Sequence, residues 1–461
     1  DAAGVLAARG LPVYLYDHVV PTPELAHAVT HLGFAAGVMV TASHNPPQDN
    51  GYKVYWGNGA QIVPPHDAGI AAAIDQVGRV GAIEVPAVDD LRAAGKVKPV
   101  PEGVLDAYLQ QVDAVRVYDG PTDITVVYTA MHGVGRRLIE TVLSRHGYAH
   151  LHVEPSQGDP DADFPTVAFP NPEEPGALDL SLALAAKVKA DVLVANDPDA
   201  DRLAVAVPDG AGGYRALTGN QIGVLLADEL LRHGPQDEGR LVATTVVSTG
   251  MLKRVADLHG AAYAETLTGF KWIANRALQH EAAGGRFVMG FEEALGYSVG
   301  PVVRDKDGVS AALVFCDLVA RCKRDGVSVL ERLAGLYRTH GLHLSLQRSV
   351  TLPGLEGAAR IVEIMRALRA APPTEIGGTP VAAVRDFAPG LGDLPPSDVL
   401  AFDLEDGSRI LARPSGTEPK IKFYFELRSP MGATEALADA EAAAVPRMEA
   451  LVAAFSAKAG V

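Results

Sequence analysis

The sequence predicts an α/β protein with several domains, and three observations support this prediction. Strand-like apolar runs alternate with helical patterns over the first three quarters of the chain, which is typical of sheets built from βαβ units. Near Leu342 the pattern changes to strand-like runs around a single helix. The chain has 461 residues, whereas a single core seldom grows beyond about 250 residues. We therefore expect three α/β units followed by a smaller α+β domain.

The first unit, expected over residues 1–118, contains two strands and one helix. The strands run from Val13 to Tyr16 and from Gly37 to Val40, and the helix runs from Pro23 to Leu32. The residues before Val13 resemble the end of a helix and include no initiator methionine, so we expect that further sequence precedes them. The turn residues Asp119-Gly120-Pro121 indicate where this unit ends.

The second unit, residues 119–213, and the third, residues 214–341, repeat this alternation, and each series could close its own sheet. We expect helices from Leu178 to Lys189 and starting near Gly250 and Trp272. The expected strands are Ile124 to Tyr128, Leu151 to Glu154, Asp191 to Ala195, Leu203 to Val207, Leu241 to Val247, Tyr263 to Leu267 and Phe287 to Gly290. Turn-rich segments at 208–213 and 339–341 indicate the two boundaries.

The last unit, residues 342–461, is the expected α+β domain. Strand-like runs at Ser345 to Leu352, Val399 to Leu404 and Ile421 to Leu427 surround one helix, Ala358 to Ala370. A long alanine-rich helix, Ala433 to Phe455, follows them.

The composition excludes several classes of function. A net charge of −16 opposes binding to nucleic acid or to an anionic membrane, so an anionic substrate needs a local cluster of cations. No apolar stretch approaches the roughly 20 residues that cross a bilayer, and the first residues do not resemble a signal peptide. Cys316 and Cys322 lie within one predicted helix, which favours reduced thiols and a cytoplasmic location. The sequence leaves the oligomeric state open.

Ser43 lies in Thr41-Ala42-Ser43-His44-Asn45-Pro46, directly after a predicted strand, where we expect a cleft. A serine at this place could carry a phosphoryl group. Because a free serine is a weak nucleophile, it needs a base within reach, and His44 and Lys53 are the nearby candidates. The alternative is a simple turn in which Asn45 and Pro46 set the backbone.

Three carboxylates at alternate positions, Asp197, Asp199 and Asp201, follow another apolar run and precede Arg202. They can converge only if a cation offsets their repulsion, which indicates a hard divalent metal. A calcium loop of the EF-hand type is excluded, because Arg202 and Pro208 stand where it needs glycine and glutamate. Two alternatives stay open: a haloacid-dehalogenase-type aspartate pair, which leaves Ser43 without a role, and a solvated acidic turn.

Two further loops carry groups suited to a phosphorylated sugar. Glu292 and Glu293 follow the strand Phe287 to Met289 and could accept hydrogen bonds from sugar hydroxyls, or could lie in the first turn of a helix. The segment Arg413-Pro414-Ser415-Gly416-Thr417-Glu418-Pro419-Lys420 gathers two cations, two hydroxyls and a glycine. This set fits a non-reacting phosphate, and the alternative is a β-hairpin turn.

A fifth loop, Thr266 to Ile273, contains a cation and a large aromatic side chain. We expect Lys271 to contact ligand, whereas Trp272 could simply pack within the domain.

These five loops, in this order and spacing, resemble those of the α-D-phosphohexomutase superfamily over nearly the whole chain, Val13 to Phe455. The resemblance implies three related α/β domains with mixed sheets plus a mobile C-terminal α+β domain, all around a central cleft. It identifies Thr41 to Pro46 as the phosphoserine loop, Asp197 to Arg202 as the Mg²⁺ loop and Thr266 to Ile273 as the specificity loop. Gly290 to Gly296 and Arg413 to Lys420 are similar to the sugar and phosphate loops.

The resemblance implies an intramolecular phosphotransferase that interconverts sugar 1-phosphates and 6-phosphates through a phosphoserine and a bisphosphorylated sugar. Glucose is the expected sugar, with a sugar bisphosphate as primer. In this scheme we expect Ser43 to carry the phosphoryl group, and its phosphate to complete a Mg²⁺ site with Asp197, Asp199 and Asp201. We expect His44 or Lys53 to assist proton removal. The implied substrate-binding residues are Lys271, Glu292, Arg413, Ser415, Gly416, Thr417 and Lys420.

The choice of sugar is less firmly indicated than the family. The metal loop, together with Phe169-Pro170-Asn171-Pro172-Glu173-Glu174 and Gly269 to Trp272, is similar to the branch that holds phosphoglucomutase and phosphopentomutase. Ala294 stands where the sugar loop usually has a serine, and Gly296 where some members have a histidine. Phosphomannomutase and phosphopentomutase activities therefore stay open, as do a metal-dependent phosphatase and a phosphosugar-binding protein without catalysis.

Overall fold

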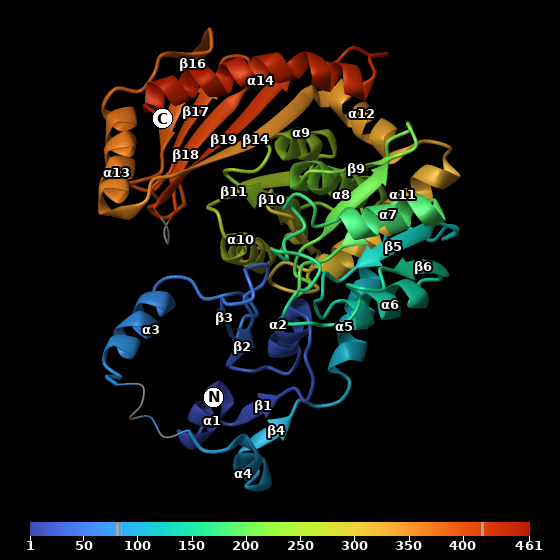
Figure 1. Ribbon diagram of the computed structural model, residues 1–461, viewed down its shortest axis with the longest axis vertical. Coiled ribbons are helices and arrows are strands. Elements are labelled where there is room, and N and C mark those ends of the chain that lie inside the picture. Colours follow the sequence, from blue (N-terminus) through green and yellow to red (C-terminus); the bar gives the residue numbers. More distant parts are fainter. Residues whose placement is uncertain (80–82, 84, 416–418) are drawn as a thin grey trace.

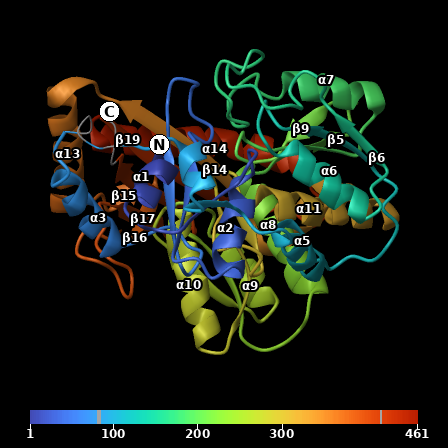
Figure 2. The same cartoon turned by 90° about the horizontal axis from the view of Figure 1, so that it is seen from below.

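The chain folds into three α/β domains and a C-terminal α+β domain, as predicted (Figure 1). A computed structural model describes residues 1–79, 83, 85–415 and 419–461. In Figure 1 the C-terminal domain lies at the top and the first domain at the bottom, with the other two between them. Seen from below, α6 and α7 lie at one side of the molecule and α13 at the other (Figure 2).

The first domain contains two small sheets among its described residues. Its elements are α1 (Ala2–Ala8), β1 (Val13–Leu15), α2 (Thr22–His31), β2 (Ala36–Val40), β3 (Tyr52–Trp56), α3 (His66–Asp75), α4 (Val88–Ala93), β4 (Val97–Pro99) and α5 (Val104–Ala114). Strand β1 pairs in parallel with β4, whereas β2 pairs antiparallel with β3. The two predicted strands therefore lie in separate two-stranded sheets. Helix α2 packs on β2 and β3 and buries Val29 against this pair.

The second domain is a mixed sheet of five strands in the order β6-β5-β7-β8-β9. Its elements are β5 (Thr125–Thr129), α6 (Arg136–Arg145), β6 (His150–Val153), α7 (Asp179–Val188), β7 (Val192–Ala195), β8 (Ala204–Pro208) and β9 (Tyr214–Ala216). All four residues of β7 are buried, as expected for a central strand covered on both faces. Because β9 pairs with β8, this sheet extends past residue 213, where we predicted the boundary with the third domain.

The third domain has four strands in the order β11-β10-β12-β13, with only β13 antiparallel to its neighbour. Its elements are α8 (Gly219–His233), β10 (Arg240–Thr245), α9 (Met251–Leu258), β11 (Ala262–Thr266), α10 (Phe270–Ala282), β12 (Arg286–Glu292), β13 (Gly296–Val299), α11 (Gly308–Arg324) and α12 (Val329–His340). Asp307 caps α11 by accepting hydrogen bonds from Val309 N and Ser310 N. Cys316 and Cys322 are buried in α11 and unpaired.

The fourth domain is an antiparallel six-stranded sheet in the order β14-β19-β18-β17-β16-β15. Its elements are β14 (Leu342–Thr351), α13 (Gly354–Ala370), β15 (Glu375–Ile376), β16 (Thr379–Asp386), β17 (Leu400–Leu404), β18 (Arg409–Pro414), β19 (Lys420–Ser429) and α14 (Leu437–Ala459). Helix α14 crosses this sheet (Figure 1). Phe455 of α14 packs its ring against Phe402, Phe423 and Phe425, with centroids 5.4, 5.5 and 5.9 Å away.

A buried ionic cluster joins the third and fourth domains. Glu426 of β19 accepts hydrogen bonds from Thr249 Oγ1 (2.9 Å), from Gly250 N and from Arg409 Nε (2.9 Å). Arg409 also pairs with Glu265 of β11 at 2.9 Å. The fourth domain is thus anchored to the amino end of α9. Among the described residues, no helix combines the length and apolar character that a membrane crossing requires.

Candidate active site

Ser43 lies just beyond the end of β2, in a loop that a glycine allows to close. The amide of Thr41 donates to the carbonyl oxygen of Gly51 at 3.1 Å, and a Cβ at position 51 would collide with the carbonyl oxygen of Thr41. Ser43 has a φ of 52°, and its hydroxyl donates to Asp197 Oδ2 at 2.9 Å. Folding thus brings together two loops that lie 154 residues apart.

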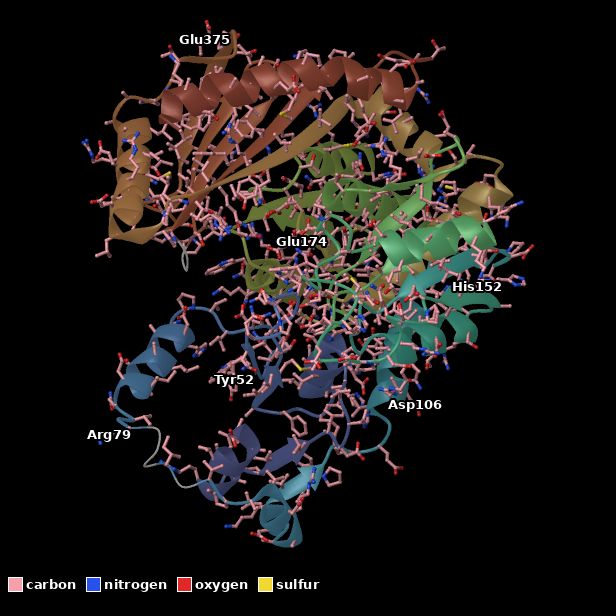
Figure 3. The ribbon with its side chains drawn as sticks, viewed as in Figure 1. Tyr52, Arg79, Asp106, His152, Glu174 and Glu375 are labelled. Carbon is pink, nitrogen blue, oxygen red and sulfur yellow. The ribbon has the colours of Figure 1, made fainter. Side chains whose placement is uncertain are left out.

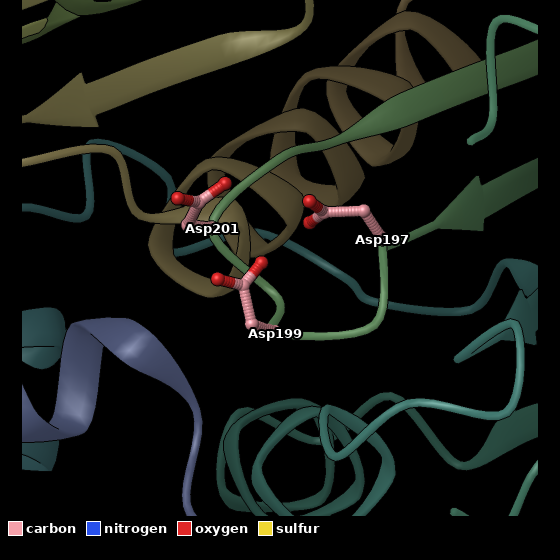
Figure 4. A group of neighbouring side chains, drawn as sticks. All are labelled: Asp197, Asp199 and Asp201. Atoms are coloured by element: carbon pink, nitrogen blue, oxygen red, sulfur yellow. The ribbon is translucent and has the colours of Figure 1, made fainter. Parts of the chain in front are cut away.

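The three aspartates of the second domain converge at the end of β7 (Figure 4). One oxygen from each lies within 4.8 Å of the others, and Asp197, Asp199 and Asp201 are 0%, 4% and 0% exposed. Burial, together with repulsion from the other two carboxylates, raises the pKa of Asp197 well above its usual range. The cluster therefore needs positive charge nearby.

Two lysines supply part of that charge. Lys53 Nζ donates to Asp199 Oδ2 at 2.7 Å and to Asp201 Oδ2 at 2.6 Å, and Lys306 Nζ lies 3.0 Å from Asp201 Oδ2. Burial would raise the pKa of Asp201, but Lys306 and Lys53 outweigh it and lower that pKa. The same carboxylates raise the pKa of Lys53 although burial opposes this, which favours the ammonium form of Lys53.

The aspartate cluster fits a hard divalent cation. All of its ligand atoms are oxygens, and Oδ1 of Asp199 and Oδ1 of Asp201 are buried with no hydrogen-bond partner in the described structure. A buried carboxylate oxygen without a partner is costly, whereas an ion would satisfy it. Thr22 Oγ1, on α2, donates to Asp199 Oδ2 at 2.9 Å and helps to orient this ligand.

His44 lies near Ser43, and Arg202 lies near Asp197. His44 Nδ1 is 3.3 Å from Ser43 Oγ, and burial and the Arg202 charge lower the pKa of His44 to about 4. Arg202 Nε lies 3.8 Å from Asp197 Oδ2, and Arg202 Nη1 lies 3.7 Å from Glu173 Oε2. His44 is thus the neutral group nearest to the serine hydroxyl.

A cavity of about 740 Å³ opens beside these residues and is lined by all four domains. His44 comes from the first domain, Arg202 from the second, Glu293 from the third and Lys420 from the fourth. Figure 3 shows Glu174, another lining residue, in the middle of the molecule between the first and fourth domains. This is the central cleft that the sequence resemblance implies.

The predicted phosphate loop includes the end of β18, at Arg413 and Pro414, and the first residue of β19, Lys420. Lys420 and Lys422 line the cavity, and Arg413 lies opposite Lys422 in the β18–β19 register. Burial and the Arg413 charge lower the pKa of Lys422, which is consistent with several cations held close together. Ser415 precedes the residues outside the described structure, which include the predicted residues Gly416 and Thr417.

The sugar and specificity loops contact each other rather than lying apart. Glu292 Oε1 accepts a hydrogen bond from Gly269 N at 2.7 Å, and burial raises the pKa of Glu292. In the described structure it is the adjacent Glu293 that lines the cavity, where it accepts a hydrogen bond from Ser248 Oγ at 2.9 Å. Lys271 Nζ lies 5.5 Å from the Trp272 ring centroid and is not among the described cavity-lining residues.

Trp272 packs against the apolar cluster between the third and fourth domains, which includes Val247 and Tyr424. Trp272 therefore packs within the protein, which was the simpler of its two expected roles.

Lys306, Thr22 and Glu173 are residues of the site that we did not predict. The glycine at position 296 indicated Lys306 indirectly. A Cβ at Gly296 would collide with the Lys306 side chain, so the glycine that departs from the family pattern leaves room for the lysine. Thr22 carried no such signal, because Asp199 lies on another element far away in the sequence. Glu173 belongs to the segment Phe169 to Glu174 that is similar to one branch of the family, but that similarity did not indicate its proximity to Arg202.

Comparison with known proteins agrees with this geometry. The phosphoglucomutase/phosphomannomutase alpha/beta/alpha domains I, II and III match residues 1–79, 105–211 and 218–339, and the C-terminal domain of the same family matches residues 356–444. A Haemophilus influenzae protein named "Probable phosphomannomutase" is 43% identical over 445 residues, covering 95% of this chain and 87% of its own length. The chain belongs to the phosphoglucomutase/phosphomannomutase family.

Two other proteins are similar to this chain over nearly its whole length. The human protein named "Phosphopentomutase" is 38% identical over 456 residues, covering 94% of this chain and 74% of its own. A crystal structure of a phosphoglucomutase/phosphomannomutase family protein from Burkholderia thailandensis superimposes with a TM-score of 0.68, at 21% identity, covering 95% of this chain and 82% of that one. The chain is therefore a phosphohexomutase-type enzyme, an isomerase that transfers phosphoryl groups.

Proposed function

We propose that the protein interconverts glucose 1-phosphate and glucose 6-phosphate, with Ser43 as the phosphoryl carrier and a bisphosphorylated glucose as the intermediate. One observation carries the proposal: Ser43 Oγ lies 2.9 Å from Asp197 Oδ2, at the edge of three buried, converging carboxylates. A serine that carried a phosphoryl group here would place its phosphate oxygens beside the proposed metal site. The phosphatase interpretation built on an aspartate pair gives Ser43 no role.

Asp197, Asp199 and Asp201 would hold Mg²⁺, whose chemistry when bound is to neutralise charge that develops on a transferring phosphoryl group. Two lysines of the chain also offset negative charge at this place. The ammonium groups of Lys53 and Lys306 lie within 3.0 Å of Asp201 and stay positively charged throughout the reaction.

The transfer itself exchanges one oxygen–phosphorus bond for another. The bond between Ser43 Oγ and phosphorus breaks, a bond from a sugar hydroxyl oxygen to phosphorus forms, the hydroxyl proton leaves to a base, and this base returns a proton to the freed Ser43 oxygen. We assign this role to His44, because its Nδ1 lies 3.3 Å from Ser43 Oγ, whereas Lys53 Nζ donates to two carboxylates. The resulting bisphosphate returns its other phosphoryl group to Ser43 after it turns over in the cavity.

A second anion site in the cavity supports this exchange. Lys420 and Lys422 line the side of the cavity formed by the fourth domain, and Arg413 lies beside them. With Ser415, Gly416 and Thr417 they would hold the phosphate that is not being transferred. Glu293, together with Glu292, would accept hydrogen bonds from sugar hydroxyls. A hydrolase would not need this second anion site.

Intact-mass spectrometry of the purified chain tests the phosphoserine directly. We expect an added mass of one phosphate, located on Ser43 by peptide mapping, and loss of both this mass and mutase turnover in Ser43→Ala. Ser144→Ala, which alters an exposed serine on α6, is the matched control and should keep both. Full mutase activity in Ser43→Ala would refute the mechanism.

A substrate panel tests the sugar and the reaction type. Coupled assays with glucose, mannose and ribose 1-phosphates, with and without a bisphosphate primer, rank the three mutase activities. Parallel measurement of released inorganic phosphate detects a phosphatase. We expect glucose 1-phosphate to be preferred and phosphate release to be a minor side reaction. Faster turnover of mannose or ribose 1-phosphate would reassign the sugar, and dominant phosphate release would reassign the class.

A further inference from the structure

The segment Phe169 to Glu174 of the second domain lines the cavity, although the proposed reaction gives it no role so far. It belongs to the long connection between β6 and α7, which runs to the centre of the molecule, where Figure 3 labels Glu174. The segment approaches the metal loop at Arg202, whose Nη1 lies 3.7 Å from Glu173 Oε2.

The segment has a defined shape that fixes the position of Glu173. Asn171 is 7% exposed, and its Oδ1 accepts a hydrogen bond from Glu173 N at 3.2 Å. The amide of Glu174 donates to the carbonyl oxygen of Asn171 at 3.0 Å. Pro170 and Pro172 restrict the backbone on either side of Asn171. Glu173 is therefore presented from a folded turn rather than from a freely moving loop.

The Arg202 guanidinium lies between two carboxylates and is hydrogen-bonded to neither. Its Nη1 is 3.7 Å from Glu173 Oε2, and its Nε is 3.8 Å from Asp197 Oδ2. Arg202 Nε is buried without a partner in the described structure. The oxygen that Arg202 approaches on Asp197 is the same Oδ2 that accepts the hydrogen bond from Ser43.

From this place the Arg202 guanidinium could move into contact with either Glu173 or Asp197. If Arg202 moved onto Asp197, it would take the lone pairs of Oδ2 and neutralise a charge that attracts a divalent cation. Asp197 is fully buried whereas the Glu173 side chain is 42% exposed, so water screens a contact between Arg202 and Asp197 less than one between Arg202 and Glu173.

We propose that Glu173 is a positioning residue that holds Arg202 away from Asp197, and thereby keeps Asp197 Oδ2 available to Ser43 and to a divalent cation. The inference rests on the metal site of the proposed function but not on mutase turnover.

Metal binding to the full-length chain provides the test. We expect Glu173→Gln to weaken Mn²⁺ binding, titrated by electron paramagnetic resonance, by about tenfold or more, which is typical when a residue that orients a metal ligand is lost. Glu173→Asp should recover most of the affinity. Asp163→Asn, which neutralises an exposed carboxylate in the same connection, should leave it unchanged. Circular dichroism spectra and melting temperatures establish that each variant is folded.

A double-mutant cycle decides whether Glu173 acts through Arg202. In an Arg202→Gln background the Glu173→Gln substitution should no longer weaken Mn²⁺ binding, because no guanidinium remains to be held. An equal loss in both backgrounds, or unchanged affinity of Glu173→Gln in the natural background, would overturn the proposal. If the chain bound Mn²⁺ as expected but showed no mutase activity, the proposed function would fail while this inference stood.

Discussion

Glu426→Gln tests how firmly the fourth domain is anchored to the third. In the natural chain, Oε1 of Glu426 accepts from Thr249 Oγ1 and contacts His343 Nδ1, and Oε2 accepts from Gly250 N and Arg409 Nε, both at 2.9 Å. The substitution keeps the shape of the side chain, but it replaces one acceptor oxygen with an amino group. If the amide nitrogen replaces Oε2, it faces the donors Gly250 N and Arg409 Nε; in the other orientation, Arg409 faces an uncharged oxygen in place of the carboxylate.

The structure sets the expected magnitude of this effect. Glu426 is 5% exposed, so Arg409 would lose its charged partner at this end and keep only Glu265, at 2.9 Å. Breaking a buried ion pair by removing one partner costs about 3–5 kcal/mol. With a urea m-value of about 3 kcal/mol/M, the unfolding transition of these domains should move to lower urea by about 1 M or more.

Urea unfolding followed by tryptophan fluorescence and circular dichroism measures this shift. Trp272 packs between the third and fourth domains and reports on their separation. Glu441→Gln is the matched control, because Glu441 also joins the fourth domain to a neighbour, through Arg215 at 2.6 Å, but with both side chains partly exposed. We expect the control to lose about 1 kcal/mol or less.

The difference between Glu426→Gln and the natural chain should also depend on pH. Burial would raise the pKa of Glu426, but the Arg409 charge and the His343 contact outweigh it and hold that pKa below the ordinary value of 4.5. The stabilisation is therefore fully present above about pH 4.5 and is lost as the pH falls further, so the two unfolding midpoints should converge in acid. Equal shifts for Glu426→Gln and Glu441→Gln at neutral pH would refute the reasoning.

Three other predictions concern the candidate active site. Chelation with EDTA should abolish mutase turnover, and Mg²⁺ should restore it; full activity after exhaustive chelation would contradict the metal assignment. Lys306→Met removes the ammonium that lies 3.0 Å from Asp201 and should lower kcat at least about tenfold, whereas the exposed Lys323→Met should not. Thr22→Val removes a buried hydroxyl that donates to Asp199 and should cost about 1 kcal/mol in thermal unfolding, with Thr22→Ser close to the natural chain.

Local patterns were sufficient to predict much of the fold. The apolar runs that became β5, β7, β10 and β12 were recognisable because buried strands must be apolar and the turns between them need particular residues. The strand pairing of the first domain was not recognisable. Val13 to Tyr16 and Gly37 to Val40 each read as a strand, but which strand pairs with which depends on long-range contacts, and β1 pairs with β4 instead of β2.

The sequence by itself determined which residue types stand at the strand ends, including Ser43, the three aspartates and the cations of the β18–β19 loop, because these motifs are contiguous in the chain. Only the tertiary structure decided their partners. It placed Ser43 beside Asp197, paired Lys53 with two carboxylates, and brought Lys306 and Glu173 to the same site from other elements. The physical reason is that hydrogen bonds and ion pairs depend on distances of a few ångströms, which separation along the chain does not specify.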